Sequence, residues 1–443
     1  MSTLKVNKLR DTTGSTDAIV LDPSGGAVLA GVTTISTARI TTGITTSIQV
    51  GGGVTISESG IEASGIGITC ASINGTQIGG RRNIIINGAF NVAQRGTSST
   101  TPGDLFQTTD RVGYIRSGLS ENTTQAQVDV TQGTSPYELG FRKALKLTNG
   151  NNSANAAQYQ TIMTKIEADD MASSGWHYTS SSSFITFSFW VKSSVSQNFY
   201  GYLYAPNRSG GGDIYPFETG SLSANTWTKV IKTVPGHTNV TFSAGAGYGL
   251  QALIAPYFGT DYTGSTTLNQ WNAYSSGGTR TPDNTATWHA TDDATFETTG
   301  WQLEVGPQAT PFEHLSMGEE LTLCQRYYFK LGKLDYLGTH MSAGEVYGIG
   351  MSDNDGTNIY AMVNFPVRMR DAPSAVDQSG SAGDYRVRRD TTKACSGVPT
   401  FVEAAEHYAR VNFPSASHGW GTGQMLWCMS AGSSGYLGFG SEL

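Results

Sequence analysis

The segment FETTGWQLEVGPQATPFEHLSMGEELTLCQRYY, residues 296–328, joins a strand pattern to a helix pattern in the middle of the sequence. The apolar residues Trp301, Leu303 and Val305 alternate with polar ones, and this period of two is typical of a half-buried strand. The Gly-Pro pair at 306–307 ends the pattern. We therefore expect this strand to be the last one of a β-sandwich.

A short helix is expected directly after that strand. Ser316, followed by Glu319 three residues on, forms a capping box, which is a signal for the start of a helix at about Met317. Lys330 and Gly332 supply the cationic last turn and the stop signal of a helix end. The sequence thus predicts one short helix near 317–331 that closes one β domain and opens another.

Length and composition favour several β domains. A chain of 443 residues is long enough for two or three domains, each with its own core. Only 14 % of the residues are charged and 55 are glycine, a composition typical of turns and short strands. The net charge is -7 and no long basic run occurs, so we expect no nucleic acid partner.

The N-terminus and the cysteines exclude further classes of protein. Residues 1–15 have no apolar core of signal-peptide length, and we expect no signal peptide, no membrane insertion and synthesis in a host cytoplasm. Cys70, Cys324, Cys395 and Cys428 lack the CxxC spacing of a zinc site. We expect them to be small buried or interface residues, and we expect no cofactor.

Residues 1–82 carry almost no charge in their later part and show a repeat. Isoleucine recurs about every five residues from Ile56 to Ile78, with glycines between, as in short strands joined by tight turns. One such chain cannot cover its apolar side, but three chains wound about one axis can. We therefore expect a trimeric β shaft that attaches through residues 5–10. The alternative is a flexible Gly/Ser/Thr linker.

Longer strand patterns follow from Asn83 onward. They include ALKLTN, FITFSFWVKSS, NFYGYLYAP, WTKVIKTV and LQALIAPYFG. The predicted fold is an all-β, elongated homotrimer. Its parts are an N-terminal attachment segment and shaft (1–82), a central β-sandwich (83–315), and a hinge helix with a C-terminal β domain (316–443).

Three separated motifs resemble a known family. WQLEVGPQATPFE, then EEL and CQRYY, resemble a signature of bacteriophage tail fibre and receptor-binding proteins, including those of marine cyanophages. NIIINGAFNVAQRG from Asn83, followed by Asp110 and Arg111, resembles the opening strand of that family, and VNFPVRMRDAP from Val363 resembles a strand of its C-terminal domain. The resemblance implies a homotrimeric virion fibre whose N-terminus binds other tail or capsid proteins.

The order of the strands from Asn83 to residue 304 also resembles that of jelly-roll carbohydrate-binding modules. In such modules the first and last strands lie side by side, and sugars bind on a concave sheet face or at edge loops. A calcium ion often bridges those strands, but Asn91 stands where such modules commonly carry an acid. We therefore predict no metal. The resemblance implies binding of host-surface polysaccharide or lipopolysaccharide.

Sugar binding needs a flat aromatic surface together with amides, carboxylates or guanidinium groups that hold the hydroxyls. The loop at 271–293 is the first candidate, and its predicted ligand-binding residues are Trp271, Tyr274, Arg280, Trp288 and His289. The alternative is that Trp271 or Trp288 anchors the loop by filling the edge of the sandwich.

A second candidate lies in ASHGWGTGQMLW, where His418 and Trp420 occupy a glycine-rich turn. Both residues are predicted to contact glycan at an exposed tip. Nearby in the same region, Arg386 and Arg388 share one strand face and are suited either to an anionic group or to carboxylates of a neighbouring chain.

Hydrolysis of a glycan would need two carboxylates that face each other across a cleft. The candidate pairs are Asp169 with Asp170, Asp292 with Asp293, and Glu304 with Glu313. Each pair has an adequate structural role, so we predict a non-enzymatic, multivalent attachment protein. The alternatives are a structural virion protein that packs against other virion proteins, and a glycan depolymerase.

Overall fold

The computed structural model describes residues 81–443 except 101–104, 207–211, 243–244, 246, 275–278, 333–344, 354–355 and 417, and before residue 81 only the backbone of short strands. By internal contacts the chain forms two units, Met1–Cys70 and Ala71–Leu443. The side chains of the isoleucine repeat, and Cys70, lie outside the described residues, so the trimeric shaft stays a prediction.

The first unit contains short antiparallel strands in two three-stranded sheets, which agrees with the short strands expected there. The first sheet has the order β1 (Lys8–Arg10), β2 (Asp17–Leu21), β3 (Ala27–Leu29). The second has the order β4 (Ser47–Val50), β5 (Val54–Ser57), β6 (Gly60–Ala63). The second unit begins with a hairpin of β7 (Ser72–Ile73) and β8 (Thr76–Gln77).

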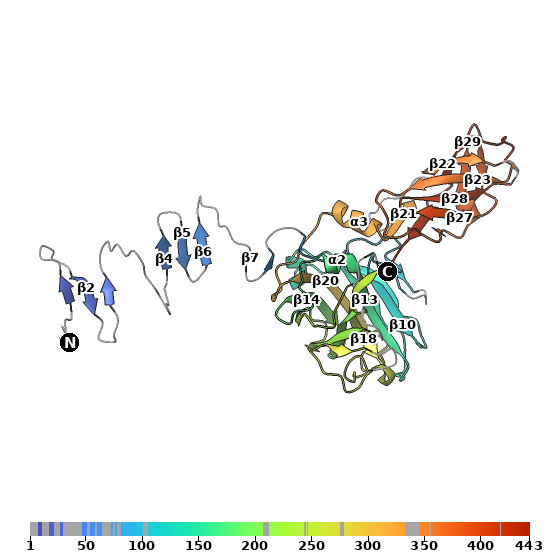
Figure 1. Ribbon diagram of the computed structural model, residues 1–443. Coiled ribbons are helices and arrows are strands. Elements are labelled where there is room, and N and C mark those ends of the chain that lie inside the picture. Colours follow the sequence, from blue (N-terminus) through green and yellow to red (C-terminus); the bar gives the residue numbers. More distant parts are fainter. Residues whose placement is uncertain are drawn as a thin grey trace. The chain divides into compact units, whose positions relative to one another are not determined.

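Two six-stranded antiparallel sheets form a sandwich in the second unit (Figure 1). Sheet A has the order β10 (Gly113–Ser117), β13 (Tyr159–Glu167), β18 (Tyr248–Phe258), β15 (Asn198–Ala205), β16 (Asp213–Ser221), β19 (Asn272–Ala273). Sheet B has the order β17 (Thr228–Pro235), β14 (Phe184–Ser193), β20 (Thr295–Val305), β12 (Lys143–Thr148), β11 (Thr124–Asp129), β9 (Ser98–Ser99). The expected all-β fold with a jelly-roll sandwich is confirmed.

The core of the sandwich lies between sheets A and B and is aromatic. On β14, Phe187 and Phe189 alternate with outward residues and are fully buried. Trp301 of β20 packs edge-on against Phe187, with 5.5 Å between the ring centroids. Each side chain of this size contributes roughly 1.5–3 kcal/mol when it is buried.

The opening segment lies beside the closing strand, as expected, but it does not form the expected strand. The amide of Ile84 donates to the carbonyl of Leu303 at 2.9 Å. Residues 86–89 then form turns, because Asn87 and Phe90 have φ angles of 58° and 56° and so lie in the left-handed region. The strand that the sequence predicts at NIIINGAF is therefore not formed.

Helix α3 (Met317–Gln325) begins where the capping box predicts. The Ser316 hydroxyl accepts from the amide of Glu319, and the Glu319 carboxylate accepts from the amide of Ser316. The predicted continuation to about 331 is wrong, because residues 328–332 form strand β21 instead. Tyr328 and Phe329 are both buried, and a strand covered on both faces accommodates this better than a surface helix. Two further helices are short, α1 (Ser135–Glu138) and α2 (Ala168–Ala172).

The remaining strands form two more sheets around a second core. Sheet C has the order β26 (Thr392–Ala394), β25 (Tyr385–Arg388), β29 (Met425–Ser430), β22 (Val346–Ser352), β23 (Asn358–Asn364), β28 (Tyr408–Pro414), β27 (Thr400–Ala405). Sheet D has the order β21 (Tyr328–Gly332), β30 (Tyr436–Gly440), β24 (Asp377–Gln378). Cys324, Cys395 and Cys428 are buried, as expected.

Residues of the motifs that resemble the phage family meet where the sandwich contacts sheet D. The amide of Gln94 donates to the Asp110 carboxylate at 2.8 Å, and its side chain donates to the carbonyl of Tyr328 at 2.6 Å. Arg111 forms an ion pair with Glu442. Burial raises the pKa of Asp110 to about 6. These motif residues hold the two β regions together.

Candidate functional site

Three tyrosines of β15 stand on the outer face of sheet A. Phe199 and Leu203 are fully buried in the sandwich core, and the strand alternation therefore places Tyr200, Tyr202 and Tyr204 on the opposite face. The sequence YGYLY carries this signal as a period-two run of tyrosines. The pattern NFYGYLYAP predicts a strand, and the row of tyrosine rings on one of its faces is an additional feature that the structure reveals.

The strand register shows what surrounds these tyrosines. Tyr200 pairs with Ala255 of β18 on one side and Glu218 of β16 on the other. The Glu218 carboxylate accepts a hydrogen bond of 2.8 Å from the Asn198 side chain. A carboxylate and an amide therefore lie at one end of the tyrosine row. The other positions on the face are mainly apolar, and they include Met163, Leu253, Ile214 and Pro216.

Tyr262, Tyr274 and Arg280 extend the aromatic surface of this face. The ring of Tyr274 lies 4.7 Å from that of Tyr204, and the ring of Tyr262 lies 5.1 Å from that of Tyr159. The Arg280 guanidinium lies 4.8 Å from the Tyr262 ring centroid, within cation–π range. We call this set the tyrosine face and define it as Tyr159, Tyr200, Tyr202, Tyr204, Tyr262, Tyr274 and Arg280.

The hydroxyls of Tyr200 and Tyr204 are neutral at physiological pH. Burial raises the pKa of both Tyr200 and Tyr204, and the nearby Glu218 raises that of Tyr200 further. A neutral phenol both donates and accepts hydrogen bonds. The face thus combines flat apolar rings with hydroxyl, carboxylate, amide and guanidinium groups. This combination fits a ligand that has apolar C–H surfaces and many hydroxyls.

No protein-family model matches the sequence, and no curated protein matches it. The fold is similar to tailspike protein 4 of bacteriophage CBA120, in the crystal structure of its enzymatically active domain. The TM-score is 0.26, the identity is 7 %, and 50 % of this chain and 21 % of that chain are covered. The chain thus spans about a fifth of that tailspike structure.

Carbohydrate-binding modules are also among the similar structures. The family 11 module from Clostridium thermocellum, in complex with a mixed-linked tetrasaccharide, has a TM-score of 0.21 and 9 % identity over 49 % of this chain and 97 % of that chain. The CBM22-1–GH10 modules of xylanase 10B from the same organism have a TM-score of 0.25 and 9 % identity over 51 % and 29 %. We therefore infer function from this chain's own side chains.

Two of the predicted ligand-binding residues of the loop at 271–293, Tyr274 and Arg280, lie together on the tyrosine face. The Arg280 guanidinium lies 5.7 Å from the Tyr274 ring centroid. Trp271 lies apart from them. Its indole nitrogen donates to the carbonyl of Pro235 at 2.8 Å, and its ring packs edge-on against Tyr215. Trp271 is half-buried against the sandwich core, so here the anchoring alternative describes the contacts better.

Trp288 and His289 lie inside the sandwich and are not exposed, contrary to the exposure expected for the loop. Both have 0 % exposed surface. Trp288 packs against Phe296 in the sandwich core, so it fills the edge of the sandwich. His289 is stacked on Tyr257, with 3.9 Å between ring centroids. Its two ring nitrogens lie 2.9 Å from the side chains of Gln158 and Gln160.

The second predicted site is also largely internal. His418 is 1 % exposed, and its Nδ1 accepts from the amide of Trp420 at 3.1 Å. Trp420 stacks on His418 and donates to the Asp390 carboxylate at 3.0 Å. The expectation of an exposed tip therefore fails for His418, because the imidazole holds the turn together. Trp420 remains half-buried.

The outer face of sheet B carries a separate aromatic groove that the sequence analysis did not predict. It has a volume of about 410 Å³ and is lined by Trp190, Phe312, His314 and Lys229, among others. Gly300 lies beneath it with φ 67°, and an added Cβ would come within 2.7 Å of the Phe141 ring. The missing side chain makes room for the aromatic residues. We call this the Trp190 groove.

The candidate catalytic carboxylates have structural partners. Glu304 is 1 % exposed and accepts from the amide of Thr310 at 2.9 Å. Glu313 accepts from the amides of Arg82 and Asn83 at 2.8 and 2.7 Å. The carboxylate of Asp169 accepts from the amide of Gly245 at 2.6 Å.

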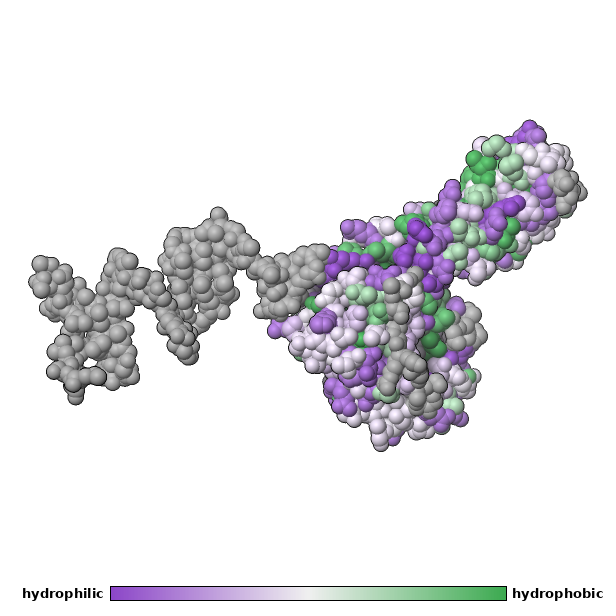
Figure 2. Space-filling model, in the orientation of Figure 1, coloured by the Kyte–Doolittle hydropathy of each residue, from purple (hydrophilic) through white to green (hydrophobic). Residues whose placement is uncertain are grey.

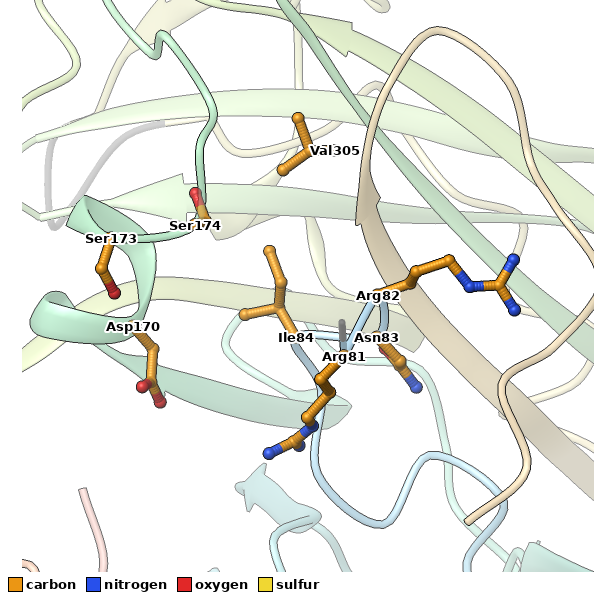
Figure 3. A pocket seen from close by; sticks show the side chains of 8 residues that line it. All are labelled: Arg81, Arg82, Asn83, Ile84, Asp170, Ser173, Ser174 and Val305. Carbon is orange, nitrogen blue, oxygen red and sulfur yellow. The ribbon is translucent and has the colours of Figure 1, made fainter. Parts of the chain in front are cut away.

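Asp170 lies at the rim of a hollow of about 300 Å³ beside the opening segment, and Figure 3 shows its side chain with those of Arg81 and Arg82. Asp170 supplies the carboxylate among the side chains that line this hollow. Cleavage of a glycosidic bond needs a second carboxylate across from the first.

Within the described part of the chain no group of His, Cys, Asp and Glu could hold a metal ion, and no helix is long and apolar enough to cross a membrane.

Proposed function

We propose that the tyrosine face binds a glycan and that the chain acts as a non-enzymatic attachment protein for host-surface polysaccharide. The observation that carries the proposal is the row Tyr200, Tyr202 and Tyr204 on the outer face of sheet A, extended by Tyr262 and Tyr274. The rings of Tyr204, Tyr262 and Tyr274 are half-buried, whereas Tyr202 is only 5 % exposed and belongs to the apolar cluster against which they pack. A domain does not usually gather partly exposed rings on one face without a ligand or partner.

The chemistry of the face suits a pyranose. The apolar C–H side of a sugar ring packs on a flat tyrosine ring, while the phenol at its edge reaches the sugar hydroxyls. Glu218 and Asn198 add an acceptor and an amide, and Arg280 adds planar donors that suit a hydroxyl pair or a carboxylate. Neutral and uronic-acid-containing polysaccharides are therefore the ligand classes we expect.

Attachment to a virion is the part of the proposal that rests on the sequence resemblance to phage tail fibres. In that setting each site needs to bind only weakly, since linked copies raise the avidity by roughly 10²–10⁴ when they bind together. The alternative of a structural virion protein predicts no glycan binding at all. The alternative of a depolymerase predicts the release of reducing ends.

The test is a polysaccharide array followed by affinity measurement on the full chain with the best binder. Tyr204→Ala removes one ring of the row and is expected to weaken binding about tenfold, equivalent to about 1.4 kcal/mol. The matched control is Tyr137→Ala, because Tyr137 is also half-buried and lies under an arginine, with Arg142 at 4.0 Å from its ring centroid.

Two further measurements separate the alternatives. Trp190→Ala alters the Trp190 groove and is expected to leave the glycan affinity unchanged. If Trp190→Ala lost affinity while Tyr204→Ala bound normally, the glycan site would lie on sheet B. Incubation with the bound polysaccharide is expected to release no reducing ends. Release would identify a depolymerase, and an absence of binding on the array would favour the structural role.

A further inference from the structure

The Trp190 groove lies over a bulge in sheet B. Two residues of β20, Gly300 and Trp301, stand opposite a single residue of β14, Phe189. Bulges of this kind redirect side chains and are common beside functional sites. A Cβ at Gly300 would come within 3.2 Å of the Trp190 ring, so the missing side chain lets the indole lie against the backbone.

One wall of the groove is the segment 309–314, and two buried side chains of β20 hold it in place. The Glu304 carboxylate accepts from the amide of Thr310 at 2.9 Å, and the Gln302 side chain accepts from the amide of Glu313 at 2.8 Å. Both side chains are at most 1 % exposed. The wall is therefore formed before a ligand arrives, which lowers the entropic cost of binding.

Three rings complete this side of the groove. Phe141, Phe312 and His314 pack on one another, with 4.8, 4.9 and 5.1 Å between their ring centroids. The imidazole of His314 is oriented by its Nε2, which donates to the carbonyl of Leu139 at 2.9 Å. Together with the indole of Trp190 these rings give the groove flat apolar surfaces, which suit a flat ligand.

A lysine stands beside the indole. Lys229 of β17 is exposed and is the cross-strand partner of Trp190. Among the residues that the structure describes it forms no ion pair, whereas Lys192, two residues from Trp190 on β14, is paired with Glu297 at 2.8 Å. None of the described residues that line the groove is acidic. The groove is therefore positively charged at neutral pH and favours an anion.

Exposed apolar residues also gather on sheet C, and Figure 2 shows hydrophobic residues where Figure 1 labels β22 and β29. Apolar exposure alone does not define a ligand, because much of any protein surface is apolar. In the Trp190 groove, by contrast, rings, charge and volume act together. Its volume of about 410 Å³ is near the lower end of the roughly 300–1,000 Å³ typical of ligand pockets, so it suits one ring with its substituents rather than a stretch of polymer.

We propose that the Trp190 groove binds a six-membered ring that carries a carboxylate. The indole packs on the apolar face of the ring, and the Lys229 amine donates to the carboxylate in a charge-assisted hydrogen bond. A uronic acid at the end of a glycan and an aromatic acid share this chemistry. The site goes beyond the proposed function, because it lies on sheet B and does not depend on polysaccharide binding at the tyrosine face.

The test is a titration of the full chain, followed by saturation-transfer NMR, with two acids and their hydroxymethyl counterparts. Glucuronate is compared with glucose, and benzoate with benzyl alcohol, since the members of each pair differ only in the carboxylate. The wild type is expected to bind at least one acid about two- to fivefold more tightly than its counterpart, as for one exposed ion pair. The acid that binds more tightly identifies the source of the ring.

Two variants, each with a matched control, examine the ring and the charge. Trp190→Ala is expected to weaken binding of the acid about tenfold, whereas Trp427→Ala, at a 47 % exposed position of sheet C, should leave it unchanged. Lys229→Met should abolish the preference for the acid and keep the ring contact. Lys232→Met is its control, because Lys232 pairs with the inward-facing Phe187 and so lies on the other face of the sheet. Circular dichroism checks that each variant is folded.

The inference is overturned if neither acid binds the wild type at about 50 mM. It is also overturned if the preference for the acid persists in Lys229→Met, or if Trp190→Ala binds like the wild type. Loss of acid binding in Tyr204→Ala, with Trp190→Ala unaffected, would place the acid on the tyrosine face. Polysaccharide binding on the array is a separate measurement, so its failure would count against the tyrosine face and not against the Trp190 groove.

Discussion

The guanidinium of Arg326 forms two parallel hydrogen bonds with the carboxylate of Glu167, 2.8 Å from Nε to Oε1 and 2.7 Å from Nη2 to Oε2. Arg326 follows helix α3, and Glu167 ends β13 of sheet A. Burial opposes the ionisation of Glu167, but hydrogen bonds from Arg326 and Tyr327 outweigh it and lower its pKa. The ion pair between Arg326 and Glu167 thus attaches the CQRYY motif to the sandwich.

Removal of this pair is expected to destabilise the chain. Glu167→Gln leaves the arginine without its counter-charge and should lower the free energy of unfolding by about 2 kcal/mol at neutral pH, less than for a fully buried pair because Arg326 is 38 % exposed. The measurement is denaturant unfolding. The control is Glu406→Gln, whose partner Arg368 is 76 % exposed, and it should change the stability by at most about 0.5 kcal/mol.

The direction of the pKa shift of Glu167 predicts how the stability loss in Glu167→Gln depends on pH. Because the pKa of Glu167 is lowered in the fold, its contribution is present above its ordinary pKa and is lost as the pH falls through the folded-state value. The difference between wild type and Glu167→Gln is therefore expected to shrink in acid. A constant difference from neutral to acidic pH would contradict the assignment.

Gly88 is expected to tolerate no side chain. A Cβ at this position would lie 2.0 Å from the carbonyl oxygen of Trp301, and backbone of the closing strand cannot move aside. Gly88→Ala should therefore lower the free energy of unfolding by about 3 kcal/mol or more. Gly318→Ala in helix α3 meets no atom within 4 Å and should instead raise stability by about 0.5–1 kcal/mol. Thermal unfolding of both variants compares them directly.

His289 is expected to make the sandwich sensitive to acid. Burial lowers the pKa of His289 to about 4, from an ordinary value of 6.5. The fold accommodates only the neutral imidazole well, so the contribution of His289 to the free energy of unfolding is complete above pH 6.5. This contribution is lost as the pH falls towards 4, by up to about 3 kcal/mol. Unfolding measured from pH 7 to about pH 4 should show this loss in wild type and in His177→Gln, whose histidine is exposed. It should be reduced in His289→Gln.

Tyr204 is expected to act mainly through its ring. Tyr204→Phe keeps the flat surface beside Tyr274 but removes the hydroxyl, so glycan affinity should fall only about two- to fivefold, less than for Tyr204→Ala. Isothermal titration with the polysaccharide selected on the array measures both. Equal losses in the two variants would mean that the hydroxyl, and not the ring, provides the contact.

Local patterns in the sequence predicted many elements correctly. The alternation in WQLEV corresponds to β20, and the Ser316–Glu319 capping box marks the start of α3. Such signals are local, because they depend on neighbours two to four residues away. The end of α3 was predicted too late, since Tyr328 pairs with Gly440, more than a hundred positions further along the chain.

The candidate site was predicted only in part, for the same reason. Tyr274 and Arg280 reach the tyrosine face, whereas Trp288 and His289 are buried against β13, β18 and β20. An aromatic residue in a polar loop has the same local signature in both cases. Its exposure depends on which sheet the loop folds onto.

The sequence by itself determined that this is an all-β protein with a short capped helix, and that the tyrosines of β15 lie on one face of their strand, because alternation and capping depend on adjacent residues. Only the tertiary structure decided that this face is the outer one, that the loop residues Tyr274 and Arg280 join it, and that the motif residues connect the two β regions. Burial is set by contacts between segments that are distant in the chain, and no local pattern records them.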